Sequence, residues 1–220
     1  MKPLIVIFLQ FAMLIFLHGQ QKATTETGET VILNADGTWV LESEPVEPTT
    51  DEKPNFRNAY WGDSLDTVKK GEDSKLAQES EDVLAYEDFV AGIHVMAVYF
   101  FEENKLTTAY YTMTDTHTNA NDYIDDYTKF KKILTDKYGT PPYDKTVWKN
   151  DLYKDDYEDW GTAIKLGHLL FLAGWELDDT SIMITLRGEN YKAGVSILYK
   201  SKELDYLEKR SDEKENQDKF

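Results

Sequence analysis

The sequence contains no cysteine in its 220 residues. It therefore forms no internal disulfide bonds, and it offers no attachment point for the thioether lipid anchor of exported lipoproteins. A chain of this length can bury a core large enough to fold without covalent cross-links. Its stability must therefore come from side-chain packing.

Basic residues are scarce in comparison with acidic ones. The chain has 24 Lys and Arg residues against 41 Asp and Glu residues, which gives a formal net charge of −17. Such a balance opposes binding to a phosphate backbone and docking on anionic membranes, so we expect no nucleic-acid partner. An acidic surface can attract cationic ligands, but more often it only keeps a protein in solution.

Long hydrophobic runs are also missing after the first 20 residues. Lys2 precedes an apolar run over residues 3–17, and the sequence turns polar after Gly19. The run is shorter than the roughly 20 residues of a membrane-spanning helix, and the arrangement is typical of a secretory signal peptide. We assign residues 1–19 to a signal peptide, with an uncleaved anchor as the alternative. The remainder should be exported, periplasmic or extracellular, with no transmembrane segment after signal removal.

The next two segments are short and differ in composition. Residues 20–42 contain two strand-forming runs, Val31–Leu33 and Thr38–Leu41, around an Asp-Gly turn, which predicts an N-terminal β-hairpin. Residues 43–55 are rich in proline and acidic side chains, which is typical of a flexible linker. At the other end of the chain, residues 203–220 form a charged tail that is either helical or disordered.

Residues 56–202 are predicted to form an α+β globular domain, an antiparallel sheet backed by helices. The spacing of apolar residues indicates helices over 65–70, 122–138 and 159–167, a polar loop over 143–157 with Trp148 tucked in, and strands over 84–90, 93–101, 106–113, 170–177, 180–188 and 192–201. This order suggests a duplicated helix-β-β-β unit with helices on one sheet face. Residues 93–101 are apolar on both faces, so this strand should be central and covered on both sides.

The sequence over residues 62–65 is Gly-Asp-Ser-Leu, the motif of the GDSL hydrolases, in which the serine is the nucleophile. That chemistry needs a histidine base oriented by an aspartate, usually as Asp-x-x-His. None of His94, His117 and His168 follows an aspartate at that spacing. Ser64 is therefore expected to cap a helix, with a GDSL-like serine esterase as the alternative.

Motifs for metal or cofactor binding are absent as well. The chain has no His-Glu-x-x-His, and the acidic clusters at 122–126, 155–156 and 178–179 lack the pattern of a calcium loop. We therefore predict no catalytic residues, no metal site and no cofactor. A calcium-binding exported protein remains a further alternative.

Several stretches carry a resemblance to known proteins. Residues 56–64, 92–111, 123–141 and 175–199 resemble a group of uncharacterised exported bacterial proteins, and residues 23–39 look like an N-terminal hairpin module of such proteins. The helix-then-three-strands order is similar in plan to the β-lactamase inhibitor protein and to small outer-membrane assembly lipoproteins. The resemblance implies a binding scaffold and no enzyme.

We therefore predict an exported, non-catalytic interaction domain that contacts a protein or a cell-envelope component through its sheet face. Alternation along the predicted strands places one set of side chains on the face opposite the apolar one. This set consists of Thr108, Tyr110, Met183, Thr185 and Arg187.

Overall fold

The computed structural model describes residues 21–24, 30–33, 39–41 and 53–217. Contacts divide the chain into two units, Met1–Glu52 and Lys53–Phe220. The predicted signal peptide and most of the predicted linker lie outside the described residues.

The first unit is a small antiparallel sheet of three strands, which runs in the order β1-β2-β3. Its strands are β1 (Gln21–Thr24), β2 (Thr30–Leu33) and β3 (Trp39–Leu41). The pairing of β2 with β3 matches the predicted hairpin, whereas β1 was not predicted.

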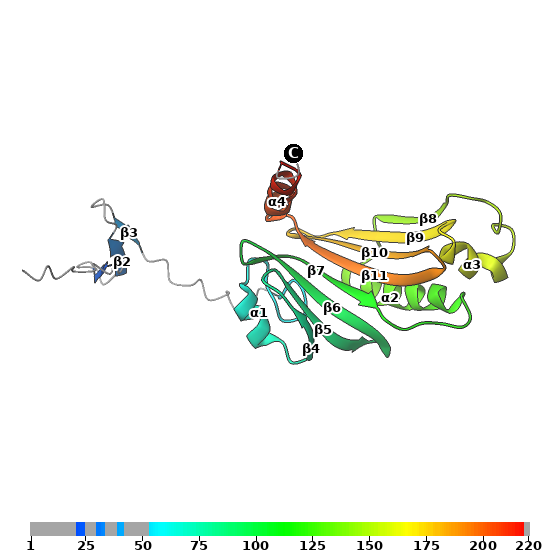
Figure 1. Ribbon diagram of the computed structural model, residues 1–220, viewed down its shortest axis with the longest axis horizontal. Helices are drawn as coiled ribbons and strands as arrows, with labels where there is room; N and C mark the ends of the chain where they lie inside the picture. The colour runs from blue at the N-terminus through cyan, green and yellow to red at the C-terminus, as the bar shows by residue number, and fades with distance from the viewer. Residues whose placement is uncertain (1–20, 25–29, 34–38, 42–52, 218–220) are drawn as a thin grey trace, which may run out of the picture. The chain divides into compact units, whose positions relative to one another are not determined.

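The second unit is built on one eight-stranded antiparallel sheet (Figure 1). Its strand order is β4-β5-β6-β7-β11-β10-β9-β8, so β7 and β11 meet in the middle and β4 and β8 form the edges. The strands are β4 (Lys75–Glu79), β5 (Val83–Val90), β6 (Ile93–Glu102), β7 (Lys105–Met113), β8 (Tyr143–Trp148), β9 (Leu169–Glu176), β10 (Thr180–Glu189) and β11 (Lys192–Ser201).

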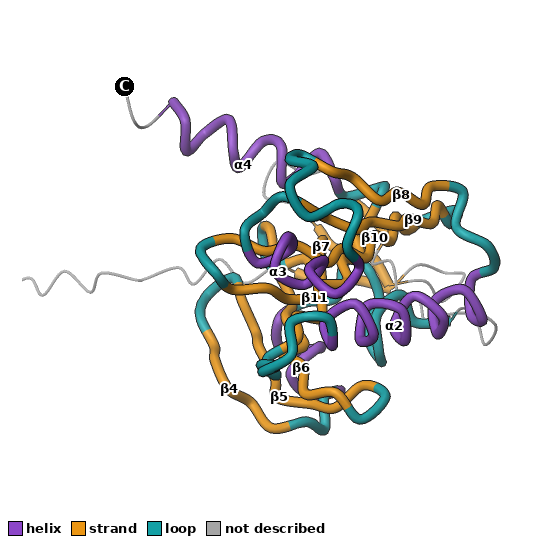
Figure 2. Tube along the Cα trace, turned by 90° about the vertical axis from the view of Figure 1, so that its right-hand side faces the viewer, coloured by secondary structure: helices purple, strands orange, loops and turns teal. Residues whose placement is uncertain are grey.

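Helices flank this sheet at four places. They are α1 (Leu65–Gly71), α2 (Asp122–Tyr138), α3 (Trp160–Lys165), which follows the 3-10 turn η1 (Tyr157–Asp159), and α4 (Asp205–Gln217). The buried stripe of α2 and the short α3 pack on the face formed by β9, β10 and β11 (Figure 2). The predicted α+β class with an antiparallel sheet is thus confirmed, and the sheet dominates the fold.

Two tight turns set the strand register. Glu103 and Asn104 connect β6 to β7 with φ of 50° and 59°, and Asn190 and Tyr191 connect β10 to β11 with φ of 52° and 64°. Two consecutive residues of positive φ are typical of type I′ turns, whose twist matches that of the strands. The link between β6 and β7 is therefore two residues long, shorter than the four residues, 102–105, between the predicted strands 93–101 and 106–113.

The edge strands β4 and β8 were not predicted, and the loop prediction for residues 143–157 is wrong over β8. All five residues of β4 are exposed, as are the first four of β8. A strand at the edge of a sheet with little burial has no alternation to detect. Each half of the sheet consequently has four strands, and the expected duplication of a helix-β-β-β unit is not confirmed.

The charged tail contributes a helix that contacts the sheet. Helix α4 touches β6 and β7, and its Leu207 is buried. Lys200 of β11 forms ion pairs with Asp205, at 2.5 Å, and with Glu208. Helix α4 therefore contacts strand β6, which the sequence predicted to be covered on both sides.

Candidate functional site

The candidate site lies on the face of β9, β10 and β11 that points away from α2 and α3. Buried and accessible residues alternate along these strands, with Ile182, Ile184 and Leu186 buried on the helix-covered side. The strand pairing aligns Thr185 with Leu172 of β9 and with Ser196 of β11. We call this surface the open face.

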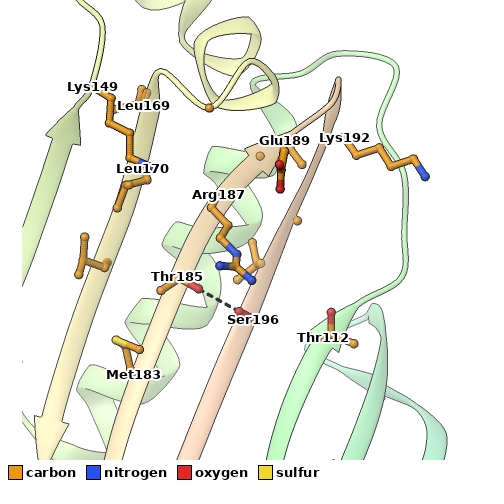
Figure 3. Close-up of a pocket in the computed structure, with 16 residues that line it drawn as sticks. Thr112, Lys149, Leu169, Leu170, Met183, Thr185, Arg187, Glu189, Lys192 and Ser196 are labelled. Atoms are coloured by element: carbon orange, nitrogen blue, oxygen red, sulfur yellow. Dashed lines mark hydrogen bonds between the residues drawn. The ribbon is translucent and has the colours of Figure 1, made fainter. Parts of the chain in front are cut away.

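The five residues predicted from alternation all lie on this face, but their surroundings differ. Thr108 is buried, and its hydroxyl donates to Glu208 of α4 at 3.1 Å. The Tyr110 ring stacks on Phe100, with 5.5 Å between ring centroids. Met183, Thr185 and Arg187 lie together along β10 (Figure 3).

Met183, Thr185 and Arg187 line a hollow of about 840 Å³ on the open face. Leu170 and Leu172 of β9 form its apolar side. The hydroxyls of Thr185 and Ser196 are hydrogen-bonded to each other at 2.9 Å on its floor (Figure 3). This volume is within the range of pockets that bind ligands.

A second hollow, of about 270 Å³, continues along the same strands. Met183 lines both hollows, and Leu198 and Lys200 of β11 line only the second. Together they form a groove that follows β10 from Ser181 to Arg187, a distance of ~20 Å at the rise of a β-strand. We call this the open-face groove.

Cations gather at one end of the groove. Lys149, Arg187 and Lys192 line the first hollow together with a single acidic residue, Glu189. Figure 3 shows Arg187 extending from β10 toward β11, and Lys192 pointing away from Glu189. Within the described part of the chain, none of these three cations forms an ion pair.

Two glycines shape this end of the groove. Gly194 lies opposite Arg187 in the strand pairing, and a Cβ there would meet nothing within 4 Å, so it leaves space beside the guanidinium. Gly188 faces the other side of the sheet, where a Cβ would lie 2.2 Å from the carbonyl oxygen of Ile164. It therefore allows α3 to pack directly on β10.

Sequence reasoning missed several residues of the groove. Lys149 follows an unpredicted strand, and Lys192 is the first residue of the predicted strand 192–201, ahead of the part where apolar and polar residues alternate. Leu170 and Leu172 lie in the apolar run 169–172, whose two faces cannot be told apart by composition. Ser196, Leu198 and Lys200, by contrast, alternate visibly with Val195, Ile197 and Tyr199 in the sequence of the predicted strand.

A separate polar cluster connects α1 to the first half of the sheet. The Arg57 guanidinium binds Asp88, and it lies 2.8 Å from both Glu72 and the Ser74 hydroxyl. Tyr99 donates a hydrogen bond to Glu72. Burial by itself would raise the pKa of Glu72, but the hydrogen bonds from Tyr99 and Arg57 lower it overall. The donors and acceptors satisfy one another, so we interpret this cluster as structural.

Ser64 occupies the N-cap of α1. Its hydroxyl accepts from the Thr67 amide at 3.2 Å and lies 2.8 Å from the Thr67 hydroxyl. His94 and His117 instead contact Asp115 and Asp126. The capping role expected from sequence is thus observed.

Among the described residues, no group of three or more His, Asp or Glu side chains is placed to hold a metal ion. Over the same residues, no helix has both the length and the apolar character needed to cross a membrane.

Comparisons of the chain with protein-family models, curated proteins and solved structures give no significant match.

Proposed function

We propose that the protein is an exported, non-catalytic binding module that contacts a protein or envelope component through the open face of its sheet. The observation that carries the proposal is the open-face groove, where hydroxyl, apolar and cationic side chains line one surface. The resemblance to exported bacterial proteins that was drawn from the sequence also implies a binding scaffold.

Two features of the groove support binding over a purely structural role. Met183 is 41% exposed on a strand whose neighbouring residues are buried. The three cations at one end of the groove have no ionic partners within the described residues. Exposed apolar and unpaired charged groups that share a concave surface are typical of recognition sites.

Site-specific photo-crosslinking in the native envelope tests this function. A benzophenone amino acid replaces Met183 in the groove or, as a control, Leu152, which is 70% exposed and not a groove residue. We expect a discrete adduct from position 183 that is missing from position 152. Identical adduct patterns from both positions, or none from position 183, would contradict the proposed function.

A further inference from the structure

The end of the groove that holds Lys149, Arg187 and Lys192 carries more positive than negative charge. The chain carries a net charge of −17, yet these three cations form no ion pair among the described residues, whereas Lys69 pairs with Glu79 and Lys75 with Glu87. Three unpaired cations against one acid in the same hollow are therefore complementary to an anionic ligand.

The shape of the groove indicates what kind of anion fits. Two hollows joined at Met183 follow the strands for ~20 Å, which is the length of about six extended residues. The groove is open and partly polar, with the hydroxyls of Thr112, Thr185 and Ser196 along one row of the sheet. Small-molecule sites enclose most of their ligand, whereas this groove is open along its length.

The two ends of the groove differ in charge. At the far end, Lys200 is neutralised by Asp205 and Glu208 of α4, and Glu176 accepts hydrogen bonds from Ser181 and Lys202. Free positive charge is thus confined to the end near Arg187. Between the two ends, Leu172, Met183 and Leu198 offer apolar contacts.

From this arrangement we propose that the open-face groove binds an extended acidic peptide segment of a partner protein, with its carboxylates at the Lys149–Arg187–Lys192 end. Arg187 provides a planar fork suited to a carboxylate, and Lys149 and Lys192 add point charges. The remaining segment lies over Leu172 and Met183. This inference rests on the proposed function and specifies the partner's chemistry.

A peptide titration tests the inference. The probe is a fluorescein-labelled peptide of about eight residues, with two glutamates at one end followed by alternating leucine and threonine. Its counterpart carries two lysines in place of the glutamates. We expect saturable binding of the acidic probe to the full chain by fluorescence anisotropy, no saturable binding of the lysine probe, and amide shift changes at Thr185 and Ser196 by NMR.

Matched double substitutions locate the contact. K149E/R187E reverses two groove cations, whereas K70E/K105E makes the same charge change at exposed cations outside the groove. Circular dichroism confirms that both variants are folded. We expect at least a tenfold loss of affinity in K149E/R187E and less than a twofold loss in K70E/K105E. Equal losses in both variants, or no saturable binding of the acidic probe, would overturn the inference.

Two further arms separate this inference from its alternatives. Saturable binding to phosphatidylglycerol vesicles that is lost in K149E/R187E, without binding of the acidic peptide, would indicate a lipid surface and overturn it. A crosslink from position 183 that persists unchanged in K149E/R187E would leave the binding function in place and reject the acidic partner. Peptide binding without any native crosslink would reject the function and retain the groove chemistry.

Discussion

Gly188 and Gly194 lie on neighbouring strands near the same end of the sheet, yet they have opposite tolerance for a side chain. A Cβ at Gly188 would lie 2.2 Å from the Ile164 carbonyl oxygen and 2.7 Å from the Lys192 carbonyl oxygen. Both obstacles are backbone atoms, which cannot rotate away as a flexible side chain can. Gly194 faces open space on the groove side.

The Gly188→Ala substitution should consequently lower the free energy of unfolding by about 3 kcal/mol or more, because overpacking displaces α3 from β10. Gly194→Ala is the matched control and should change it by less than about 1 kcal/mol. Urea denaturation followed by tryptophan fluorescence measures both values. Similar losses in the two variants would contradict the close approach of α3.

At the same scale, the Arg57 cluster makes stability depend on pH. Burial alone would raise the pKa values of Glu72 and Asp88. Hydrogen bonds from Tyr99 and Arg57 nevertheless lower the pKa of Glu72 below its ordinary value of 4.5. Hydrogen bonds from Arg57 and the Phe89 amide likewise lower the pKa of Asp88 below its ordinary value of 3.8. A carboxyl whose pKa is lower in the folded state stabilises it above its unfolded pKa. This stabilisation is lost as the pH falls through the pKa values that Glu72 and Asp88 have in the folded protein.

Glu72→Gln should therefore destabilise the protein by about 3 kcal/mol at pH 7, because it breaks an ion pair in which Glu72 is almost fully buried. The difference from the parent should shrink as the pH falls from 5 to 3. Glu79→Gln removes an exposed pair with Lys69 and should cost less than about 1 kcal/mol. Urea titrations across this pH range provide the test, and a pH-independent gap for Glu72→Gln would rule out the linkage.

At the scale of an element, tertiary contacts decide the conformation and the position of helix α4. Its sequence is mostly charged, so propensity and composition leave helix and disorder equally open. The structure shows one buried apolar residue, Leu207, beside ion pairs from Lys200 to Asp205 and Glu208. Tertiary contacts of these few side chains hold the beginning of α4 against β6 and β7.

Leu207→Ala should detach α4 from the sheet, since truncating a buried leucine costs about 2–5 kcal/mol. Hydrogen exchange should then accelerate for the amides of α4, and Thr108 should lose its hydrogen bond to Glu208. Tyr206→Ala is the control at the adjacent position, because Tyr206 is 54% exposed. Unchanged exchange in Leu207→Ala would show that the ion pairs alone hold the helix.

At the scale of the whole molecule, two four-stranded halves share one sheet through the pairing of β7 with β11. The buried cluster runs without interruption from Phe56 and Tyr99 to Ile184 and Trp175. Phe56 itself contacts Tyr99 of β6 and Tyr199 of β11, at 5.2 Å and 5.1 Å between ring centroids. A continuous core favours cooperative unfolding of both halves.

We expect native-state hydrogen exchange to give the same free energy of opening for the slowest amides of β6 and of β10. These strands lie in different halves of the sheet and have no shared ladder. A difference above about 1 kcal/mol between them would mean that the halves open separately, as independent cooperative units do.

The elements predicted correctly are those whose residue pattern lies within a single segment. Helix α2 has the predicted bounds, since its apolar spacing, its acidic first turn and Gly139 with a φ of 85° act within one segment. Strand β11 also matches the prediction, because half-buried and buried residues alternate along it from Gly194 to Ser201. Strands β4 and β8 escaped prediction because they become strands only by pairing with β5 and β9.

The sequence by itself determined which residues of β10 face the helices and which face away, because side chains alternate in direction along any strand. It therefore placed Met183, Thr185 and Arg187 on one surface. Only the tertiary structure decided which strands lie beside β10, and it thereby brought Leu172, Ser196 and Lys149 to the same groove. The tertiary structure also placed α4 against Thr108, whose hydroxyl donates to Glu208. Strand order depends on the packing of distant segments, and no local pattern of residues encodes it.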